Sequence, residues 1–222
     1  MKLTRTKIAA FAVALLVLAL PVLGQKHPSE LAPAPPLSFK APKPVMFTLG
    51  NGIRVAYLQD TELPLVWALG YFKGGSLYEP AGKTGLAQLT ATVLRTGGTM
   101  TRNGDQINEE LEFIAATIEA GGGSEFMQVT GSALKKDFGK LMEVYADLVM
   151  NPAFPQDKLD LARNQSLEGM RRRWDQPMQV SNILFQEKLY GPDSPYGRRS
   201  TPATLKAVTR EDLAAFHKRF FS

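Results

Sequence analysis

Histidine and cysteine are the side chains that most often ligate metals or act as nucleophiles, and this sequence has very few of them. Its 222 residues contain two histidines, His27 and His217, and no cysteine. The lack of cysteine excludes disulfides, thiolate zinc sites, iron–sulfur clusters and cysteine nucleophiles. His27 lies in a proline-rich stretch and is expected to be solvated. His217 lies on an apolar helical stripe, which is typical of a residue at the edge of the core. The sequence therefore leaves little room for a histidine-built metal site.

Other catalytic arrangements also lack support in the sequence. No Gly-x-Ser-x-Gly segment marks a nucleophilic serine. Glu109 and Glu110 are adjacent on a predicted helix, so their carboxylates face different directions and are expected to be solvated. The glycine run at residues 121–123 lies between a predicted helix and a predicted strand, which is the wrong context for a phosphate-binding loop. A serine hydrolase and a nucleotide-binding enzyme are both disfavoured.

The N-terminus has the charge pattern of an exported protein. The formal net charge is +5, and three of the basic residues fall within the first seven positions, before an unbroken apolar run at residues 8–20. This pattern predicts a secretory signal peptide over residues 1–24, cleaved before Gln25, and hence a periplasmic or secreted protein. The alternative is an uncleaved anchor, which would be the chain's one contact with the membrane. Residues 25–44, with six prolines, are predicted to form an extended linker.

Removing the three basic residues of the signal peptide leaves a net charge of +2, which is too small to indicate a nucleic-acid-binding protein. The one tight basic cluster, Arg171–Arg173, lies beside Trp174 in a predicted helix. A solvated helix face explains that cluster best. No nucleic-acid partner is therefore expected.

The folded part is expected to begin near residue 45 with strands and to continue mainly with helices. Asn51-Gly52 predicts a hairpin between strands at 47–49 and 53–58, with positive φ at both turn positions. Further strands are predicted at 65–72 and 126–134. Helices are predicted at 84–96, 105–118, 136–150, 157–174 and 178–190, and a last one begins with a Thr209–Asp212 capping box after a loop at 192–202. This order favours an α+β fold over a βαβ nucleotide-binding fold.

Six stretches of the chain together resemble one family. In chain order they are residues 48–55 (TLGNGIRV), 74–80 (GGSLYEP), 83–87 (KTGLA), 151–154 (NPAF), 190–197 (YGPDSPYG) and 209–213 (TREDL). They are similar to the N-terminal half of insulinase/pitrilysin-family zinc peptidases, the group that includes mitochondrial processing peptidase. The resemblance covers residues 46–222 and implies an antiparallel sheet packed against helices.

Active members of that family carry an inverted zinc motif, His-x-x-Glu-His, on the helix that follows Gly-Leu-Ala. Two imidazoles one helical turn apart hold Zn²⁺, and the glutamate activates the water bound to it. The corresponding positions here are Gln88, Ala91 and Thr92, and all three chemical groups are missing. Glu168 stands where the third ligand would be expected, but it is given no metal role without the other two. We therefore expect no zinc in this chain and no hydrolysis by this chain alone.

The resemblance implies a non-catalytic subunit that helps to bind and enclose peptides or unfolded polypeptides together with a zinc-bearing homologous subunit. Zinc is expected only in that partner. Such substrates are held by strand addition to a sheet edge, and the matching strand runs from Gly123 to Val129, with Gly123, Ser124, Glu125 and Phe126 as candidate peptide-binding residues. An ordinary paired strand is the alternative interpretation of this segment.

Two further expectations remain open from the sequence. The chain could be a stand-alone peptide-binding or scaffolding protein with no protease partner. Family halves usually continue into another strand and a second homologous half, so a chain that stops at Ser222 is expected to be the first part of a longer protein.

Overall fold

The computed structural model describes residue 39 and residues 41–221. The predicted signal peptide at 1–24 lies outside the described residues, as does most of the predicted linker at 25–44. A boundary after Gln59 divides the chain into two units, Met1–Gln59 and Asp60–Ser222.

The first unit contains a hairpin of β1 (Val45–Thr48) and β2 (Arg54–Tyr57), which confirms the predicted hairpin. Its turn differs from the predicted one. Gly52 has a φ of 89°, but Asn51 is not among the residues with positive φ. The N–H groups of Leu49 and Gly52 donate to the carbonyls of Ile53 and Leu49, both at 2.9 Å. The loop therefore has three residues, Gly50 to Gly52, instead of the predicted two. Its last residue, Gly52, is left-handed, as in a hairpin with a bulge, so one loop position needs a positive φ.

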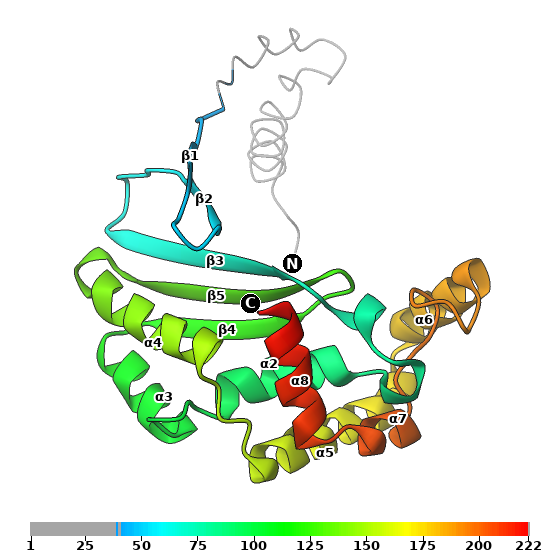
Figure 1. Cartoon of the computed structure of the whole chain (residues 1–222). Helices are drawn as coiled ribbons and strands as arrows, with labels where there is room; N and C mark the ends of the chain where they lie inside the picture. The colour runs from blue at the N-terminus through cyan, green and yellow to red at the C-terminus, as the bar shows by residue number, and fades with distance from the viewer. Residues whose placement is uncertain (1–38, 40, 222) are drawn as a thin grey trace, which may run out of the picture. The chain divides into compact units, whose positions relative to one another are not determined.

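The second unit is built on a three-stranded antiparallel sheet in the order β3-β5-β4 (Figure 1). The strands are β3 (Leu65–Lys73), β4 (Thr117–Gly122) and β5 (Phe126–Leu134). In β5 the alternate residues Met127, Val129, Gly131 and Ala133 are buried, because one face of the sheet packs on helices. The predicted strands at 65–72 and 126–134 are confirmed.

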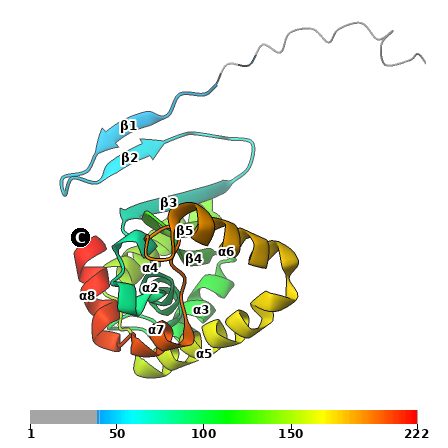
Figure 2. The same cartoon turned by 90° about the vertical axis from the view of Figure 1, so that its right-hand side faces the viewer.

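Seven α-helices follow or interrupt these strands in the described residues (Figures 1 and 2). They are α2 (Leu86–Thr96), α3 (Gly104–Phe113), α4 (Phe138–Met150), α5 (Gln156–Arg172), α6 (Pro177–Tyr190), α7 (Pro202–Ala207) and α8 (Arg210–Phe220). Helices α2 and α4 contact the sheet, and α5 and α8 contact α2 from its other side. None of the described helices is long and apolar enough to cross a membrane. The predicted α+β fold is confirmed.

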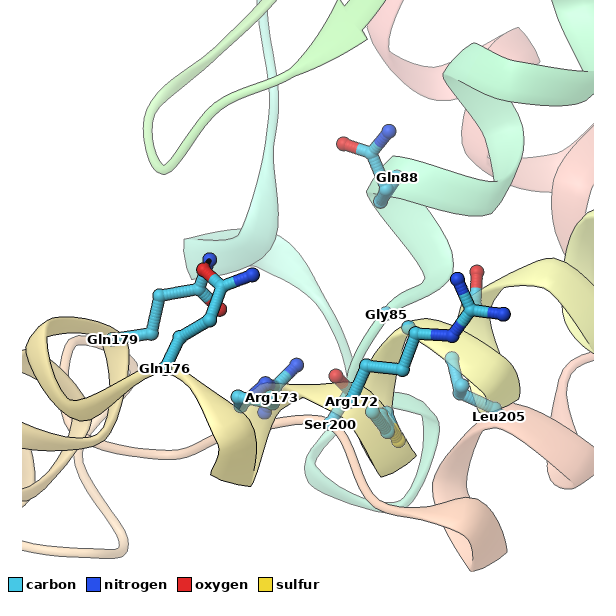
Figure 3. Close-up of a pocket in the computed structure, with 11 residues that line it drawn as sticks. Gly85, Gln88, Arg172, Arg173, Gln176, Gln179, Ser200 and Leu205 are labelled. Atoms are coloured by element: carbon cyan, nitrogen blue, oxygen red, sulfur yellow. Dashed lines mark hydrogen bonds between the residues drawn. The ribbon is translucent and has the colours of Figure 1, made fainter.

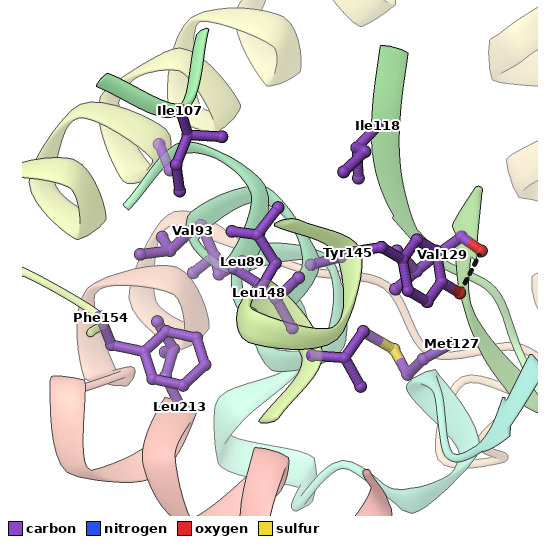
Figure 4. Close-up of a cluster of buried hydrophobic side chains, with 14 of the residues drawn as sticks. Leu89, Val93, Ile107, Ile118, Met127, Val129, Tyr145, Leu148, Phe154 and Leu213 are labelled. Carbon is purple, nitrogen blue, oxygen red and sulfur yellow. Dashed lines mark hydrogen bonds between the residues drawn. The ribbon is translucent and has the colours of Figure 1, made fainter. Parts of the chain in front are cut away.

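The core forms where α2 is enclosed between the sheet and the outer helices (Figure 4). The predicted stripe of Leu86, Leu89 and Val93 on α2 is buried. Opposite it, Tyr145 of α4 donates a hydrogen bond from its hydroxyl to the carbonyl of Val129 at 2.9 Å. Burying a large apolar side chain stabilises a fold by roughly 1.5–3 kcal/mol. The helix that carries the motif positions is therefore held rigidly.

The predicted helix at 105–118 is wrong in its last third. Helix α3 ends at Phe113, and residues 117–122 form β4 instead. Ala115 adopts a left-handed φ of 50°, and the N–H of Ala116 donates to the carbonyl of Leu111 at 2.9 Å. A helix often ends with one residue in the left-handed conformation, and that residue is usually glycine. An alanine there gives no signal in the sequence.

The predicted loop at 192–202 is followed at once by the short helix α7, which the sequence analysis missed. Thr201 caps it through a capping box with Thr204, and Pro202 occupies its first turn. Proline is favoured at that position because its missing N–H would have no helical partner. The next helix, α8, has the predicted box: the Thr209 N–H donates to Asp212 at 2.8 Å, and the Asp212 N–H donates back to the Thr209 hydroxyl at 3.3 Å.

His217 of α8 lies at the core edge, as its spacing predicted. Its Nε2 lies 2.7 Å from the carbonyl of Val149, and its ring stacks on Phe221 at 4.9 Å between centroids. Burial lowers the pKa of His217, although the hydrogen bond to Val149 opposes that effect. This histidine is thus engaged in joining α8 to the end of α4.

Arg102 joins three elements through its guanidinium, which reaches Asp147 of α4 at 2.7 Å and Glu110 of α3 at 3.0 Å. Burial disfavours the ionised form of Asp147. Hydrogen bonds from Arg102 and Asn151 outweigh burial and lower the pKa of Asp147 from 3.8 to about 2. The ionised carboxylate therefore stabilises the packing of α4 against the loop before α3.

Acid is expected to remove the stabilisation that the ionised Asp147 carboxylate provides. Because the folded-state pKa is depressed, the stabilisation is fully present above pH 3.8 and is lost as the pH falls toward about 2. The loss should be about 1–2 kcal/mol after allowance for solvent screening. Urea unfolding between about pH 2 and 5 measures it, and Asp147→Asn should show a flatter pH dependence than the unaltered chain. Equal slopes for the two proteins would contradict the assignment.

Candidate functional site

The start of α2 is held in place by a buried carboxylate. Gly85, with a left-handed φ of 108°, precedes the helix and offers no side-chain cap. The Glu79 carboxylate, 5% exposed, accepts hydrogen bonds from the N–H groups of Gly85 at 2.9 Å and Ala87 at 2.7 Å. Burial raises the pKa of Glu79, while the two N–H donors and nearby Arg198 favour its ionised form. This contact fixes the first turn of α2 and thus the direction of the next side chain, Gln88.

The three motif positions occupy one side of α2. Gln88 is exposed, Thr92 is half-buried, and the Gln88 amide nitrogen lies 3.4 Å from the Thr92 hydroxyl. Ala91 is 1% exposed and belongs to the core. The one-turn spacing of a two-ligand face is present, because residues four apart share a helix face. The side chains at Gln88, Thr92 and Ala91 carry an amide, a hydroxyl and a methyl group. None of these groups can replace an imidazole ligand or act as a general base.

Glu168 does not complete a metal site with these residues. It lies exposed on α5, where its carboxylate pairs with Arg171 at 2.5 Å. Within the part of the chain that the structure describes, no three His, Asp or Glu side chains converge so that they could hold a metal ion. Zinc prefers imidazole, thiolate and carboxylate ligands. The residues present therefore do not fit a zinc ion, and we assign no hydrolytic step to this chain.

The predicted peptide-binding residues lie where β4 turns into β5. The carbonyls of Gly123, Ser124 and Glu125 accept hydrogen bonds from the N–H groups of Ser76, Leu77 and Gly74, each at 3.0 Å. Phe126 begins β5, the central strand, and pairs with Lys73 of β3. These backbone groups are thus engaged within the chain. Peptide binding by Gly123–Phe126 stays a prediction.

The described sheet has two outer strands, β3 and β4, and β4 is the one that lies beside α2; its outer side is called the open edge below. The side chain of Arg95 donates a hydrogen bond to the carbonyl of Ile118, which therefore points away from β5. Backbone groups of an antiparallel strand alternate in direction, so those of Ala120 and Gly122 also point outward. Arg95 covers the Ile118 end of this edge and is itself held by Asn108 at 3.0 Å. No hydrogen bond within the described residues takes up the outward backbone groups of Ala120 and Gly122.

The end of β4 lies directly against α2. A Cβ placed on Gly122 would be 3.0 Å from the Gln88 nitrogen and 3.0 Å from the Ala87 carbonyl carbon. Neighbouring Gly121 has nothing within 4 Å of the same atom. Gly122 therefore allows the close approach that brings the open edge beside Gln88.

Gly122→Ala is expected to destabilise the fold by about 1–2 kcal/mol, because its Cβ meets backbone atoms that cannot rotate away. Gly121→Ala is the matched control and should change stability by less than about 0.5 kcal/mol. Chemical unfolding of the two variants measures the difference. Equal effects would show that the contact with α2 is loose.

A pocket of about 480 Å³ opens between the start of α2 and the region where α5 leads into α6 (Figure 3). Its walls include Gln88 but no carboxylate of the described residues. The sequence did not predict this pocket. Its one signal there is the basic run Arg171–Arg173, whose pattern is typical of a solvated helix face. The polar side chains that line the pocket are Gln88, Ser166, Arg172, Arg173, Gln176, Gln179 and Ser200.

The chain is similar to known proteins of one family. Residues 54–192 match the family described as Insulinase (Peptidase family M16). The chain is 28% identical over 192 residues to mitochondrial-processing peptidase subunit alpha of Solanum tuberosum, covering 84% of this chain and 37% of that protein. It is 26% identical over 182 residues to cytochrome b-c1 complex subunit 1 of Mus musculus, covering 81% of this chain and 37% of that protein.

Among solved structures, a peptidase M16 inactive domain from Pseudomonas fluorescens superposes with a TM-score of 0.72 at 23% identity, over 79% of this chain and 43% of that one. A similarity at this identity shows the fold. The chain spans about two fifths of the length of the relatives it matches. Because the family match extends over more than half of the chain, the protein belongs to the insulinase family, peptidase family M16.

Proposed function

We propose that this chain is a non-catalytic insulinase-family subunit that binds extended peptide and helps to enclose it with a zinc-bearing homologous subunit. The observation that carries the proposal is α2 itself. The helix keeps the position and spacing of a two-ligand face, with Gln88 and Thr92 one turn apart, but neither residue is an imidazole, thiolate or carboxylate ligand for zinc. Two relatives named as subunits, of a processing peptidase and of a cytochrome complex, support a role beside a partner.

The open edge of β4 supports the peptide-binding part of the proposal. Ala120 and Gly122 direct backbone groups away from β5, so an extended peptide would add as a further strand at this edge. Exposed strand edges attract pairing unless something covers them. In the part of the chain that the structure describes, Arg95 covers the end of the edge at Ile118. The peptide would then pass beside Gln88.

Export is a further part of the proposal, and it rests on the sequence of residues 1–24. A basic start followed by an apolar run directs a chain to the secretory pathway. The partner would have to reach the same compartment, periplasmic or outside the cell. Zinc would reside in the partner.

Purification of the tagged chain from its native host tests the proposal. We expect a zinc-bearing homologue to co-purify, with about one zinc ion per pair. Chelator-sensitive peptide cleavage should occur in the complex and be absent from the isolated chain. Stoichiometric zinc with cleavage by the isolated chain would overturn the non-catalytic assignment. Peptide binding without any partner would instead support a stand-alone binding or scaffolding protein.

A further inference from the structure

The pocket beside Gln88 is lined by hydrogen-bond donors and positive charge. Arg172 and Arg173 both border it, and neither forms an ion pair with a carboxylate of the described residues. Arg171, in the same run, is paired with Glu168 at 2.5 Å. Two uncompensated guanidinium groups next to a concave surface raise the local concentration of anions.

A neighbouring pocket of about 470 Å³ extends this positive region. It shares Arg173 with the first pocket and adds Arg199 and Lys206, again without a carboxylate of the described residues. Arg199 is partly compensated by Glu187 at 3.5 Å. The charge of these walls favours an anion over a cation.

The amide side chains narrow the class of anion. The Gln179 amide nitrogen donates to the Gln176 amide oxygen, which leaves the Gln176 amide nitrogen as a donor toward the opening (Figure 3). A guanidinium fork flanked by amide donors matches the planar geometry of a carboxylate. The volume of about 480 Å³ is at the lower end for ligand sites, so it suits one or two residues of a longer molecule.

The position of the pocket indicates that this longer molecule is a peptide. Gly122, at the open edge of β4, lies against the backbone of Gln88, and Gln88 borders the pocket. A strand paired with Ala120–Gly122 would lead past Gln88 to the two arginines. We propose that this pocket binds a carboxylate of the peptide, so that the chain selects acidic segments or C-terminal ends. This inference rests on the proposed peptide-binding function.

Titration calorimetry of the full chain with three peptides of about ten Ser and Val residues tests it. One peptide has a free C-terminal carboxylate, one is amidated and carries a single Glu, and one is amidated with Gln in place of that Glu. We expect at least one acidic peptide to bind about tenfold more tightly than the neutral one. The preferred acidic peptide identifies whether the carboxylate belongs to the chain end or to a side chain.

The double variant R172Q/R173Q should abolish this preference. The matched control is Lys218→Gln, which removes one exposed positive charge on α8 that borders neither pocket. That control should keep the preference within about twofold. Equal binding of all three peptides, or a preference that survives in R172Q/R173Q, would overturn the inference while leaving peptide binding intact. Failure of every peptide to bind would overturn the proposed peptide-binding function as well.

Discussion

Replacing Gly75 with alanine is expected to lower the free energy of unfolding by about 3 kcal/mol or more. Gly75 has φ 116° and ψ −172°, a region of backbone space that glycine alone occupies readily. A Cβ there would lie 2.6 Å from the carbonyl oxygens of both Gly123 and Ser124. Those oxygens accept the N–H groups of Ser76 and Leu77, so they cannot withdraw without breaking these hydrogen bonds.

The matched control for this prediction is Gly82→Ala. Gly82 lies in the short turn Ala81–Lys83, its φ is not positive, and a Cβ there would have nothing within 4 Å. The control should stay within about 0.5 kcal/mol of the unaltered chain. Thermal unfolding followed by circular dichroism measures the stability of the Gly75→Ala and Gly82→Ala variants. If Gly75→Ala melted together with the control, the loop at 123–125 could not be the rigid support that positions the end of β4.

The elements that the sequence predicted well are those whose signals are local. Strand β5 alternates buried and half-buried residues, and the buried stripe of α2 recurs at helical spacing. The capping box of α8 needs only Thr209 and Asp212, three residues apart. In each case the side chains that decide the structure are neighbours in the chain.

The missed features depend on the tertiary fold. Strand β4 was hidden because Ala115 takes the left-handed conformation without a glycine to mark it. The position of β4 at the open edge follows from strand order, which residue alternation within a strand does not determine. The basic pocket brings Gln88 beside Arg172, more than eighty residues away in the chain. From the sequence alone, a run of three arginines is typical of a solvated helix face. The tertiary fold places the start of α2 opposite this run, and the two together form the pocket.

Introducing histidine at both ligand positions, Gln88→His with Thr92→His, is expected to create zinc affinity about a hundredfold above that of the unaltered chain. The two positions are one turn apart and already lie within hydrogen-bonding distance of each other through their present side chains. Two imidazoles there can share one ion. Zinc titration against a metal indicator measures the gain.

The matched control places the same two histidines too far apart. Gln88→His with Thr96→His puts the residues eight positions apart, about 12 Å along the helix axis, and both sites are exposed. This pair should gain no more than about threefold in affinity, since no single ion can bridge it. Equal affinity of the two double variants would show that the face of α2 at Gln88 and Thr92 is not available to a metal.

Zinc binding in that variant should not bring hydrolysis with it. The general base of the active motif falls on Ala91, which is 1% exposed in the core. Ala91→Glu must bury a carboxylate where a methyl now packs, so we expect it to cost about 3 kcal/mol unless bound metal offsets that cost. Adding Ala91→Glu to the two histidines should therefore destabilise the zinc-free chain and regain stability on zinc addition. Chelator-sensitive cleavage by the histidine pair alone would contradict this separation of metal binding from catalysis.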